Sequence, residues 1–384
     1  MIRIVHLITT FGLGGAERNL SQLVCYMDRA RFANTVVTMT DVPPLDKDVM
    51  EPMLAQAGVP FHSLGLRLGS ANPLAAVRLF AILRKERPHI LQTWLYHADL
   101  LGLLVGKLAR VPALVWNLQC SFMDLKQYRR LSWLVLRMLI PLSRFPDMIL
   151  TNSEAGYRFH ASLGYKPRRW MYLPNAVDLE VFRPSPDLRI WLRRELGLGQ
   201  DALLIGLIAR FDAMKDHGNF IAAAELITRQ WPSLHFVLAG RGVDSNNSEL
   251  VRLIACTGAA ERFHLLGHRN PISFITTGLD IVCSSSYGEG CPNTIIEAMA
   301  CGIPCVTTDV GDSASVVGTT GIVVPPRNPQ ALAQACDSLL SIGPERRREL
   351  GTHARRRVEE HFSLPSVVAR YQHLCEQLGQ PECK

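Results

Sequence analysis

The sequence predicts an α/β protein made of two successive Rossmann-like domains, and three observations support this prediction. Its 384 residues are more than one ordinary α/β core contains. Short apolar runs alternate with amphipathic stretches, a pattern typical of βαβ units around a parallel sheet. The alternation stops near residue 175, in the proline-containing segment YLPNAVDLEVFRPSP, and then restarts. We therefore expect domains at 1–180 and 181–362, and a C-terminal helix at 363–384 that packs back toward the first domain.

The first domain opens with a strand at 2–9, rich in β-branched residues, and a glycine loop that leads into a helix from about Ala16. The later apolar runs predict strands at 32–39, 90–93, 113–117 and 147–151. The amphipathic stretches between them predict helices at 49–57, 73–87 and 98–109.

In the second domain the alternation resumes at residue 203. It predicts strands at 203–211, 234–240, 263–266, 279–284, 303–308 and 321–324. The chain closes with predicted helices at 328–340, 344–360 and 364–378. Because ligands of such sheets bind beyond the carboxyl ends of strands, the loops that follow strands are where we expect the site.

The net charge of +7 is unevenly distributed. Residues 1–180 contain 21 lysines and arginines against 13 acidic residues, whereas the remainder contains 20 against 21. The first domain therefore faces something acidic. A basic and aromatic platform or a zinc finger is missing from the sequence, so we expect no nucleic-acid partner; a membrane surface or a phosphate-bearing acceptor fits better.

Cysteine usage and hydropathy predict a cytoplasmic protein. The ten cysteines form no CxxC pair, and we expect reduced, buried thiols in apolar surroundings, such as Cys25, Cys256, Cys283 and Cys336. The N-terminal segment does not have the pattern of a signal peptide, and no apolar run is long enough to span a membrane. The DxD pair Asp46 and Asp48 lies in a polar loop far from the other candidate residues, and we expect no metal site.

Two loops carry candidate ligand-binding residues. FGLGGAER follows the first strand, and Gly14 and Gly15 would let backbone N–H groups approach a phosphate or sugar; alternatively this is a tight turn. In IGLIARFDAMKDH, Arg210 ends a strand and Lys215 follows five residues later. Two cations at a strand end can hold a diphosphate, although two solvated surface cations would give the same pattern.

The third loop, YGEGCPNTIIEAMACGIPCVTTDVG, is the most informative. Pro292 suits the first helical position, so the N–H groups of Asn293 and Thr294 would point toward an anion. Glu289 and Glu297 flank this helix start. Carboxylates bind vicinal hydroxyls, so a ribose and a sugar are natural partners; an acidic helix start is the alternative.

These blocks resemble retaining family 4 glycosyltransferases with the GT-B fold. EGCPNTIIEAMACGIPCVTTDVG resembles the family's E-x7-E region, and GLGGAER its first glycine loop. TNSEAGYRFHASLGY followed by LPNAVDLEVFRP resembles its NSE…PNG-D…F-P segment. ARFDAMKDH resembles its R-x4-K segment, and GIVVPPRNPQAL its closing stretch. The blocks follow the family's order over nearly the whole chain, which makes the set far more specific than E-x7-E alone.

The resemblance implies two Rossmann-like domains that face each other across a cleft, and a role for each matching residue. Gly14 and Gly15 would lie beside the donor diphosphate, which Arg210 and Lys215 would neutralise. Glu297 would bind the ribose, and Glu289 the transferred sugar. The segment assisting them would be Gly290, Cys291, Pro292, Asn293 and Thr294. The resemblance also implies retention of anomeric configuration without a metal ion.

Two positions depart from the family pattern. Where members often have a histidine facing the donor sugar, this chain has Gln119, which cannot shuttle a proton. His97 is the best remaining imidazole near a strand end and our candidate for a catalytic histidine, although it could simply begin a helix. Ala176 replaces the glycine of PNG-D, which suggests that this turn does not need positive φ.

We therefore expect a hexosyltransferase that moves a sugar from a nucleotide sugar, with UDP as the family's commonest nucleotide, to a glycan or lipid-linked acceptor in cell-surface polysaccharide or glycolipid synthesis. A nucleotide-sugar epimerase of the same architecture and a non-catalytic nucleotide-sugar or glycan-binding protein remain alternatives. A Rossmann dehydrogenase is disfavoured because GLGGAER lacks the fingerprint spacing.

Membrane attachment is a further expectation for the first domain. The segment from Leu125 to Phe145 combines a large apolar surface with the cations Lys126, Arg129, Arg130, Arg137 and Arg144. On a helix it could lie in a bilayer interface, with its cations toward anionic headgroups. The alternative is an ordinary helix packed on the sheet.

Overall fold

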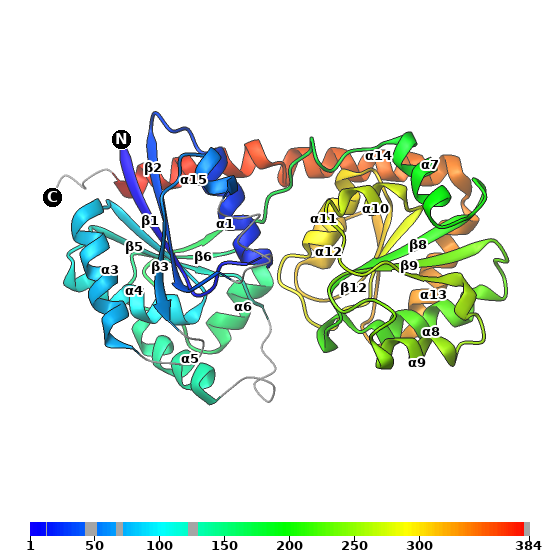
Figure 1. Ribbon diagram of the computed structural model, residues 1–384, viewed down its shortest axis with the longest axis horizontal. Helices are drawn as coiled ribbons and strands as arrows, with labels where there is room; N and C mark the ends of the chain where they lie inside the picture. Colours follow the sequence, from blue (N-terminus) through cyan, green and yellow to red (C-terminus); the bar gives the residue numbers. More distant parts are fainter. Residues whose placement is uncertain (13, 43–51, 67–71, 122–129, 380–384) are drawn as a thin grey trace. The chain divides into compact units, whose positions relative to one another are not determined.

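The computed structural model describes residues 1–12, 14–42, 52–66, 72–121 and 130–379. It divides the chain into two compact units (Figure 1). Unit 1 combines Met1–Ala176 with Leu364–Lys384, and unit 2 is Val177–Ser363. The chain therefore leaves unit 1 at residue 176, where we expected 180, and re-enters it at 364.

Unit 1 is built on a seven-stranded parallel sheet with the order β3-β2-β1-β4-β5-β6-β7. Its strands are β1 Ile2–Ile8, β2 Phe32–Thr40, β3 Phe61–Leu66, β4 Ile90–Trp94, β5 Ala113–Leu118, β6 Met148–Thr151 and β7 Trp170–Tyr172. The order reverses between β1 and β4, and open α/β sheets bind ligands at such a point.

Helices cover both faces of this sheet. Helices α1 (Gly15–Tyr26) and α15 (Leu364–Gly379) pack on one face. The other face carries α3 (Pro73–Glu86), α4 (Tyr96–Leu108) and α5 (Arg130–Leu142). Along β1 the residues alternate between the two cores, as the pleat requires: Ile4 and Ile8 join the first core, and Val5 and Leu7 the second. A further helix, α6, spans Glu154–Ser162.

Helix α15 belongs to unit 1 because its apolar stripe closes the first core. Its buried residues, spaced by three or four along the helix, are Leu364, Val367, Val368, Tyr371, Leu374 and Cys375. Within this stripe the Tyr371 hydroxyl donates a hydrogen bond to Gln92 Oε1 on β4. One buried polar contact thus fixes the helix on the sheet.

Unit 2 contains a six-stranded parallel sheet with the order β10-β9-β8-β11-β12-β13. Its strands are β8 Leu203–Ile208, β9 Leu234–Ala239, β10 Phe263–Leu265, β11 Ile281–Ser284, β12 Cys305–Thr308 and β13 Gly321–Val324. Its helices are α7 Pro186–Glu195, α8 His217–Thr228, α9 Ser248–Ala255, α10 Ser273–Gly278, α11 Asn293–Ala300, α12 Ser313–Val317, α13 Pro329–Ser341 and α14 Gly343–His361, with 3₁₀ turns η1 Ala213–Lys215 and η2 Ala260–Arg262. Here the order reverses between β8 and β11.

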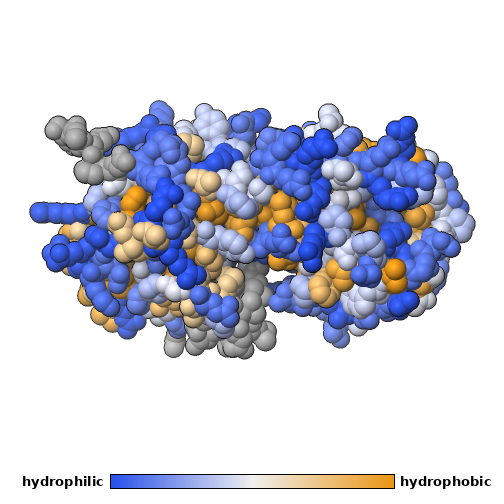
Figure 2. Space-filling model, turned by 90° about the horizontal axis from the view of Figure 1, so that it is seen from above, coloured by the Kyte–Doolittle hydropathy of each residue, from blue (hydrophilic) through white to orange (hydrophobic). Residues whose placement is uncertain are grey.

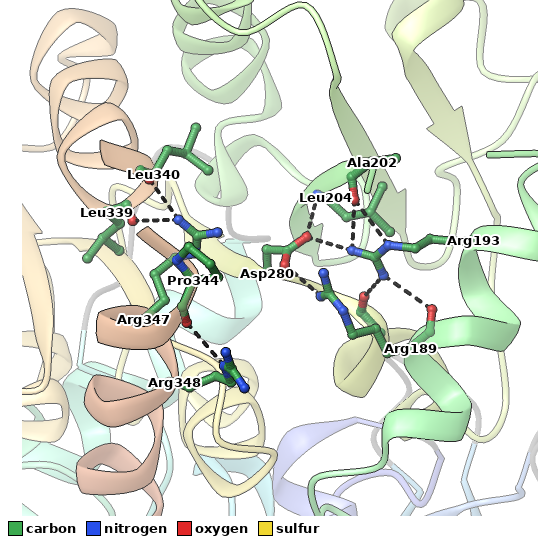
Figure 3. A network of polar contacts seen from close by, with 11 residues as sticks. Arg189, Arg193, Ala202, Leu204, Asp280, Leu339, Leu340, Pro344, Arg347 and Arg348 are labelled. Carbon is green, nitrogen blue, oxygen red and sulfur yellow. Dashed lines mark hydrogen bonds and ion pairs between the residues drawn. The ribbon is translucent and has the colours of Figure 1, made fainter. Parts of the chain in front are cut away.

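A buried ion pair anchors the start of β11 (Figure 3). The fully buried Arg193 of α7 donates to Asp280 Oδ2 at 2.7 Å, and the same oxygen accepts from Leu204 N–H at 2.8 Å. Arg189 contacts the other carboxylate oxygen at 2.6 Å. Because both oxygens have partners, burial of this charge is compensated, and β11 is fixed beside β8.

The expectation that no segment spans a membrane agrees with the described residues, but the expected burial of the cysteines holds only in part. No helix within the described residues is long and apolar enough to cross a bilayer. Figure 2 shows a largely hydrophilic face with separate hydrophobic patches. The nine described cysteines are free thiols, and Cys283 and Cys336 are buried as predicted. Cys256 is exposed, contrary to expectation, because it caps the surface end of α9.

Candidate functional site

The strongest candidate residues follow β8 and β11, which are adjacent in the sheet of unit 2. Ile205 on β8 pairs with Ile281 on β11, and both strands run in the same direction. Their carboxyl ends therefore lie at the same edge, at the point where the strand order reverses. The following loops are joined by their backbones, since Tyr287 N–H donates to the Met214 carbonyl at 2.9 Å.

This arrangement brings Lys215 and Glu289 together, although they are 74 positions apart. Lys215 Nζ lies 2.5 Å from Glu289 Oε1, and the Ser286 hydroxyl donates to the same oxygen at 2.7 Å. The two charged side chains are mostly buried, with 22% and 12% of their areas exposed. The pair is therefore a fixed feature of the loops rather than a chance contact between flexible surface groups.

The loop that carries Lys215 is held by its own side chains. Asp212 Oδ1 accepts from Met214 N–H at 2.9 Å and begins the turn η1. Asp216 follows Lys215 with a positive φ of 48°, and its side chain caps α8. Left-handed backbone at a non-glycine residue is uncommon and concentrates at functional sites. Arg210 is set apart: its guanidinium pairs with Asp212 at 3.1 Å and is 57% exposed.

Helix α11 begins one residue later than predicted. Pro292 is its cap, with a non-helical ψ of 87°, and Asn293 is the first helical residue. The Pro292 carbonyl accepts from the N–H groups of Ile295 and Ile296. The first turn, with Asn293 and Thr294, still directs its N–H groups outward from the start of the helix. Glu297 lies in the next turn and is 6% exposed.

Several supporting residues were not predicted from the sequence. Ser285 Oγ bonds to the carbonyls of Lys215 and Asp216 at 2.8 and 2.9 Å. Thr308 Oγ1 donates to the Ser286 carbonyl at 2.5 Å. The run of three serines that begins with the last residue of β11 was the available signal.

Gly311 is required by a close approach of two loops. It has a φ of 57°, and a Cβ there would lie 2.4 Å from the Glu289 carbonyl oxygen. The next residue fixes the approach, because Asp312 N–H donates to the Gly290 carbonyl at 3.0 Å. The loop after β12 thus supports the backbone of the Glu289 turn.

The glycine loop of unit 1 begins α1 without unusual backbone. Gly14 is the cap of the helix with a φ of −80°, and Gly15 is its first residue. A Cβ on Gly14 would instead lie 2.3 Å from the Glu17 carboxylate. That carboxylate is the end of a flexible side chain that can move aside, so space alone does not require glycine here.

His97 follows β4, the strand adjacent to β1. Leu95, just before α4, has φ 72° and ψ 152°, a strained conformation for leucine. The half-buried His97 is placed in the first turn of α4, and burial lowers the pKa of its imidazole. The ring is thus neutral near physiological pH. The strand order of unit 1 reverses between β1 and β4, and the segments that follow these two strands contain Gly14, Gly15 and His97.

Gln119 belongs to a chain of amide side chains at the carboxyl edge of the same sheet. Its Nε2 donates to Asn117 Oδ1 at 2.6 Å, and its Oε1 accepts from Asn152 Nδ2 at 2.9 Å. Asn175 Oδ1 accepts from Asn152 and from Asn19 of α1. Residue 176 does not have positive φ, as the alanine suggested. The amide chain was not predicted, because isolated Asn and Gln residues carry no distinctive pattern.

Metal binding receives no support from the part of the chain described. Those residues contain no group of three or more His, Cys, Asp or Glu side chains placed to hold an ion. Asp46 and Asp48 lie outside the described residues. The absence of a metal requirement therefore stays a prediction.

Comparison with known proteins identifies two family models that match this chain. A model described as Glycosyltransferase Family 4 matches residues 13–181, and one described as Glycosyl transferases group 1 matches residues 202–341. The chain belongs to the family 4 glycosyltransferases. The prediction of two Rossmann-like domains is confirmed.

Relatives of this family 4 glycosyltransferase include a putative glycosyltransferase, EpsF, of Bacillus subtilis, 26% identical over 80% of this chain and 79% of the relative. A UDP-Gal:alpha-D-GlcNAc-diphosphoundecaprenol alpha-1,3-galactosyltransferase of Escherichia coli is 26% identical over 63% of each chain. The structure of Anabaena Alr3699/HepE in complex with UDP superposes with a TM-score of 0.84 at 21% identity, over 98% of this chain and all of the other. That last likeness concerns the fold alone.

Proposed function

We propose that this glycosyltransferase moves a hexose from a nucleotide sugar, a UDP-sugar, to a lipid-linked or glycan acceptor, with retention of configuration and without a metal ion. The observation that carries the proposal is the meeting of Lys215 and Glu289 at the strand-order reversal of unit 2. A cation for a diphosphate and a carboxylate for sugar hydroxyls lie there side by side, next to the start of α11. The site thus contains what a diphosphate sugar requires.

In this reaction negative charge develops on the diphosphate as the anomeric C–O bond breaks. Lys215 lies on a rigid turn, so its charge is in place before the reaction and stabilises the leaving group. Arg210 supplies a second, more exposed cation. Glu297 binds the ribose hydroxyls from α11.

The acceptor is proposed to be lipid-linked because an apolar and basic surface covers one face of unit 1. Helices α4 and α5 pack on the same core, and they present Leu104, Leu108, Trp133, Leu134 and Met138 to solvent. The cations Lys107, Arg110, Arg137 and Arg144 lie among or beside them. Among the described side chains of these two helices the one acidic residue is Asp99, which is buried.

An anionic bilayer suits this surface, since apolar side chains enter the interface while cations contact headgroups. The structure describes only part of the segment predicted at 125–145, because residues 122–129 lie outside the described residues. In the described part, α5 packs on the sheet through Val135, Leu136 and Leu139. Its opposite side remains exposed, so packing on the sheet and contact with a bilayer are compatible.

The decisive assay combines a panel of nucleotide sugars with undecaprenol-diphosphate-linked and soluble glycan acceptors. We expect nucleoside diphosphate to be released when donor and acceptor are both present, in EDTA as well as without it, and an α-linked product from an α-linked donor. Interconversion of the donor without acceptor would instead identify an epimerase. Binding without turnover on any acceptor would favour a non-catalytic protein.

A further inference from the structure

Two of the groups that contact Glu289 bear on how a donor would bind. In the structure its Oε1 accepts from Lys215 Nζ at 2.5 Å and from the Ser286 hydroxyl at 2.7 Å. The proposed function, on which this inference rests, requires the same lysine to contact a diphosphate. A diphosphate that approaches Lys215 also approaches the Glu289 carboxylate, and these two anions repel each other.

The two loops allow the lysine to move while the carboxylate stays in place. Ser286 lies three residues before Glu289 and would still hold Oε1 after Lys215 turned away. The backbone of the Glu289 turn is fixed from both sides, by the contact of Tyr287 with Met214 and by that of Asp312 with Gly290. Lys215 has a long flexible side chain with rotatable donors.

We propose that donor binding exchanges these partners and that Glu289 thereby discriminates the sugar nucleotide from the free nucleoside diphosphate. Lys215 moves from the carboxylate to the diphosphate, and the hydroxyls of the sugar take its place on Glu289. A donor that carries its sugar satisfies both groups. A free nucleoside diphosphate satisfies Lys215 alone and leaves the carboxylate facing phosphate charge without its cation.

Weaker binding of the nucleoside diphosphate than of the sugar nucleotide favours turnover, because it promotes release of the product. After transfer, the sugar no longer contacts Glu289, and the ion pair with Lys215 re-forms as the diphosphate departs. Glu289 thus acts in product release as well as in sugar binding. Its negative charge lowers affinity for the product, and this sets the proposal apart from a role in which Glu289 merely holds Lys215 in place.

The test compares variants by calorimetric titration with UDP, GDP and ADP, and then with the matching sugar nucleotides. Glu289→Gln keeps the shape of the side chain and removes its charge. We expect it to bind the preferred nucleoside diphosphate about tenfold more tightly than the wild type, an ordinary size for the removal of one repulsive charge at a binding site. Its preference for the sugar nucleotide over the diphosphate should shrink accordingly.

Glu297→Gln is the matched control, because it makes the same acid-to-amide change nearby on a residue assigned to the ribose. It should weaken binding of the diphosphate. Glu289→Asp, which retains the charge, should give no gain in affinity. If Glu289→Gln melts at a lower temperature than the wild type, Glu289→Ala removes the same charge and should change affinity in the same direction.

Equal or weaker binding of the diphosphate by folded Glu289→Gln or Glu289→Ala would overturn the exchange and leave Glu289 as a support for Lys215. That outcome would not affect the proposed function. The proposed function fails separately if the wild type binds none of the three nucleoside diphosphates.

Discussion

Lys215 is the residue whose charge the proposed reaction needs most. Its position on a capped turn, 22% exposed, gives a preorganised cation at the leaving group. Lys215→Ala should therefore lower kcat by about 10²–10³-fold, the usual cost of removing one such group. Arg252→Ala, which removes an exposed cation of α9 in the same unit, is the control and should leave steady-state rates unchanged. Full activity of Lys215→Ala would contradict the assignment.

The two glutamates should separate binding from transfer. Glu297 is buried in α11 and Glu289 sits in the preceding turn. Glu297→Ala should weaken UDP binding through lost ribose hydrogen bonds. Glu289→Ala should instead reduce the transfer rate without lowering the affinity for UDP. Titration of UDP and single-turnover kinetics on both variants measure this difference. Equal UDP affinity of Glu297→Ala and the wild type would exclude the ribose role.

At the scale of single residues, the sequence selected candidate residues but not the contacts between them. The motif spacing and the family resemblance selected Lys215 and Glu289, but nothing in the chain indicates that they touch across 74 positions. That contact depends on β8 and β11 being neighbours, which is a property of the whole sheet. The cap at Pro292 and the amide chain through Gln119 were missed for the same reason, since both depend on three-dimensional context.

At the scale of elements, long buried strands and amphipathic helices were predictable to within one to three residues. The strand predicted at 321–324 is β13 itself, and that at 2–9 is one residue longer than β1. The strands β3 and β7 were missed. Both lie at the edges of their sheet, and β7 has three residues, all half-buried, so neither shows a sustained apolar run.

One buried hydrogen bond adds to the apolar packing that holds helix α15 on the sheet. Tyr371→Phe removes the hydroxyl that Gln92 accepts from and leaves a buried amide oxygen unsatisfied. We expect a loss of about 1–3 kcal/mol in the free energy of unfolding of unit 1. Tyr157→Phe, an exposed tyrosine of α6, is the matched control and should have little effect. Urea denaturation followed by tryptophan fluorescence would measure both; equal stability of the two variants would exclude the anchoring role.

The outer surface of α4 and α5 should bind anionic membranes. Co-sedimentation with vesicles that contain phosphatidylglycerol should be strong at low salt and should weaken as salt screens the cations. Leu104→Ser combined with Leu108→Ser removes two side chains that are 60% and 71% exposed, so binding should fall while the fold persists. The control, Val181→Ser with Leu226→Ser, changes exposed apolar residues of unit 2 and should bind like the wild type. Failure of the wild type to sediment would favour a soluble acceptor.

At the scale of the whole molecule, the chain crosses from unit 1 to unit 2 and returns with α15, so unit 1 is complete only when the C-terminal segment has been synthesised. The proline-containing segment and the restart of alternation located the first crossing from the sequence. We also expected the C-terminal helix to pack back toward the first domain. Each unit repeats the same strand order around β1 and β8, which is why each has its own reversal with loops suited to ligands.

Buried ionisable groups in both units predict how the molecule responds to acid. Burial lowers the pKa of His6 and His160 in unit 1 and of His217 in unit 2 to about 4. Between about pH 6.5 and 4 the unfolded chain binds protons at these rings that the folded chain does not, so stability falls as pH falls through this window. Asp99 acts in the opposite direction, because burial raises the pKa of its carboxyl well above the usual value and the folded form keeps its proton.

Calorimetric melts at intervals from pH 7.5 to 4.5 should therefore show a falling Tm, and two variants should change its slope in opposite directions. His217→Gln removes one ring that opposes protonation in the folded state, so the loss of stability on acidification should be shallower than in the wild type. Asp99→Asn removes the carboxyl whose titration stabilises the folded state on acidification and so partly offsets the destabilisation by His6 and His160. The loss of stability on acidification should therefore be steeper than in the wild type. The comparison is between slopes, which separates titration from any constant loss of stability that the substitutions cause. Parallel curves for all three proteins would mean that groups other than these buried side chains govern the acid response.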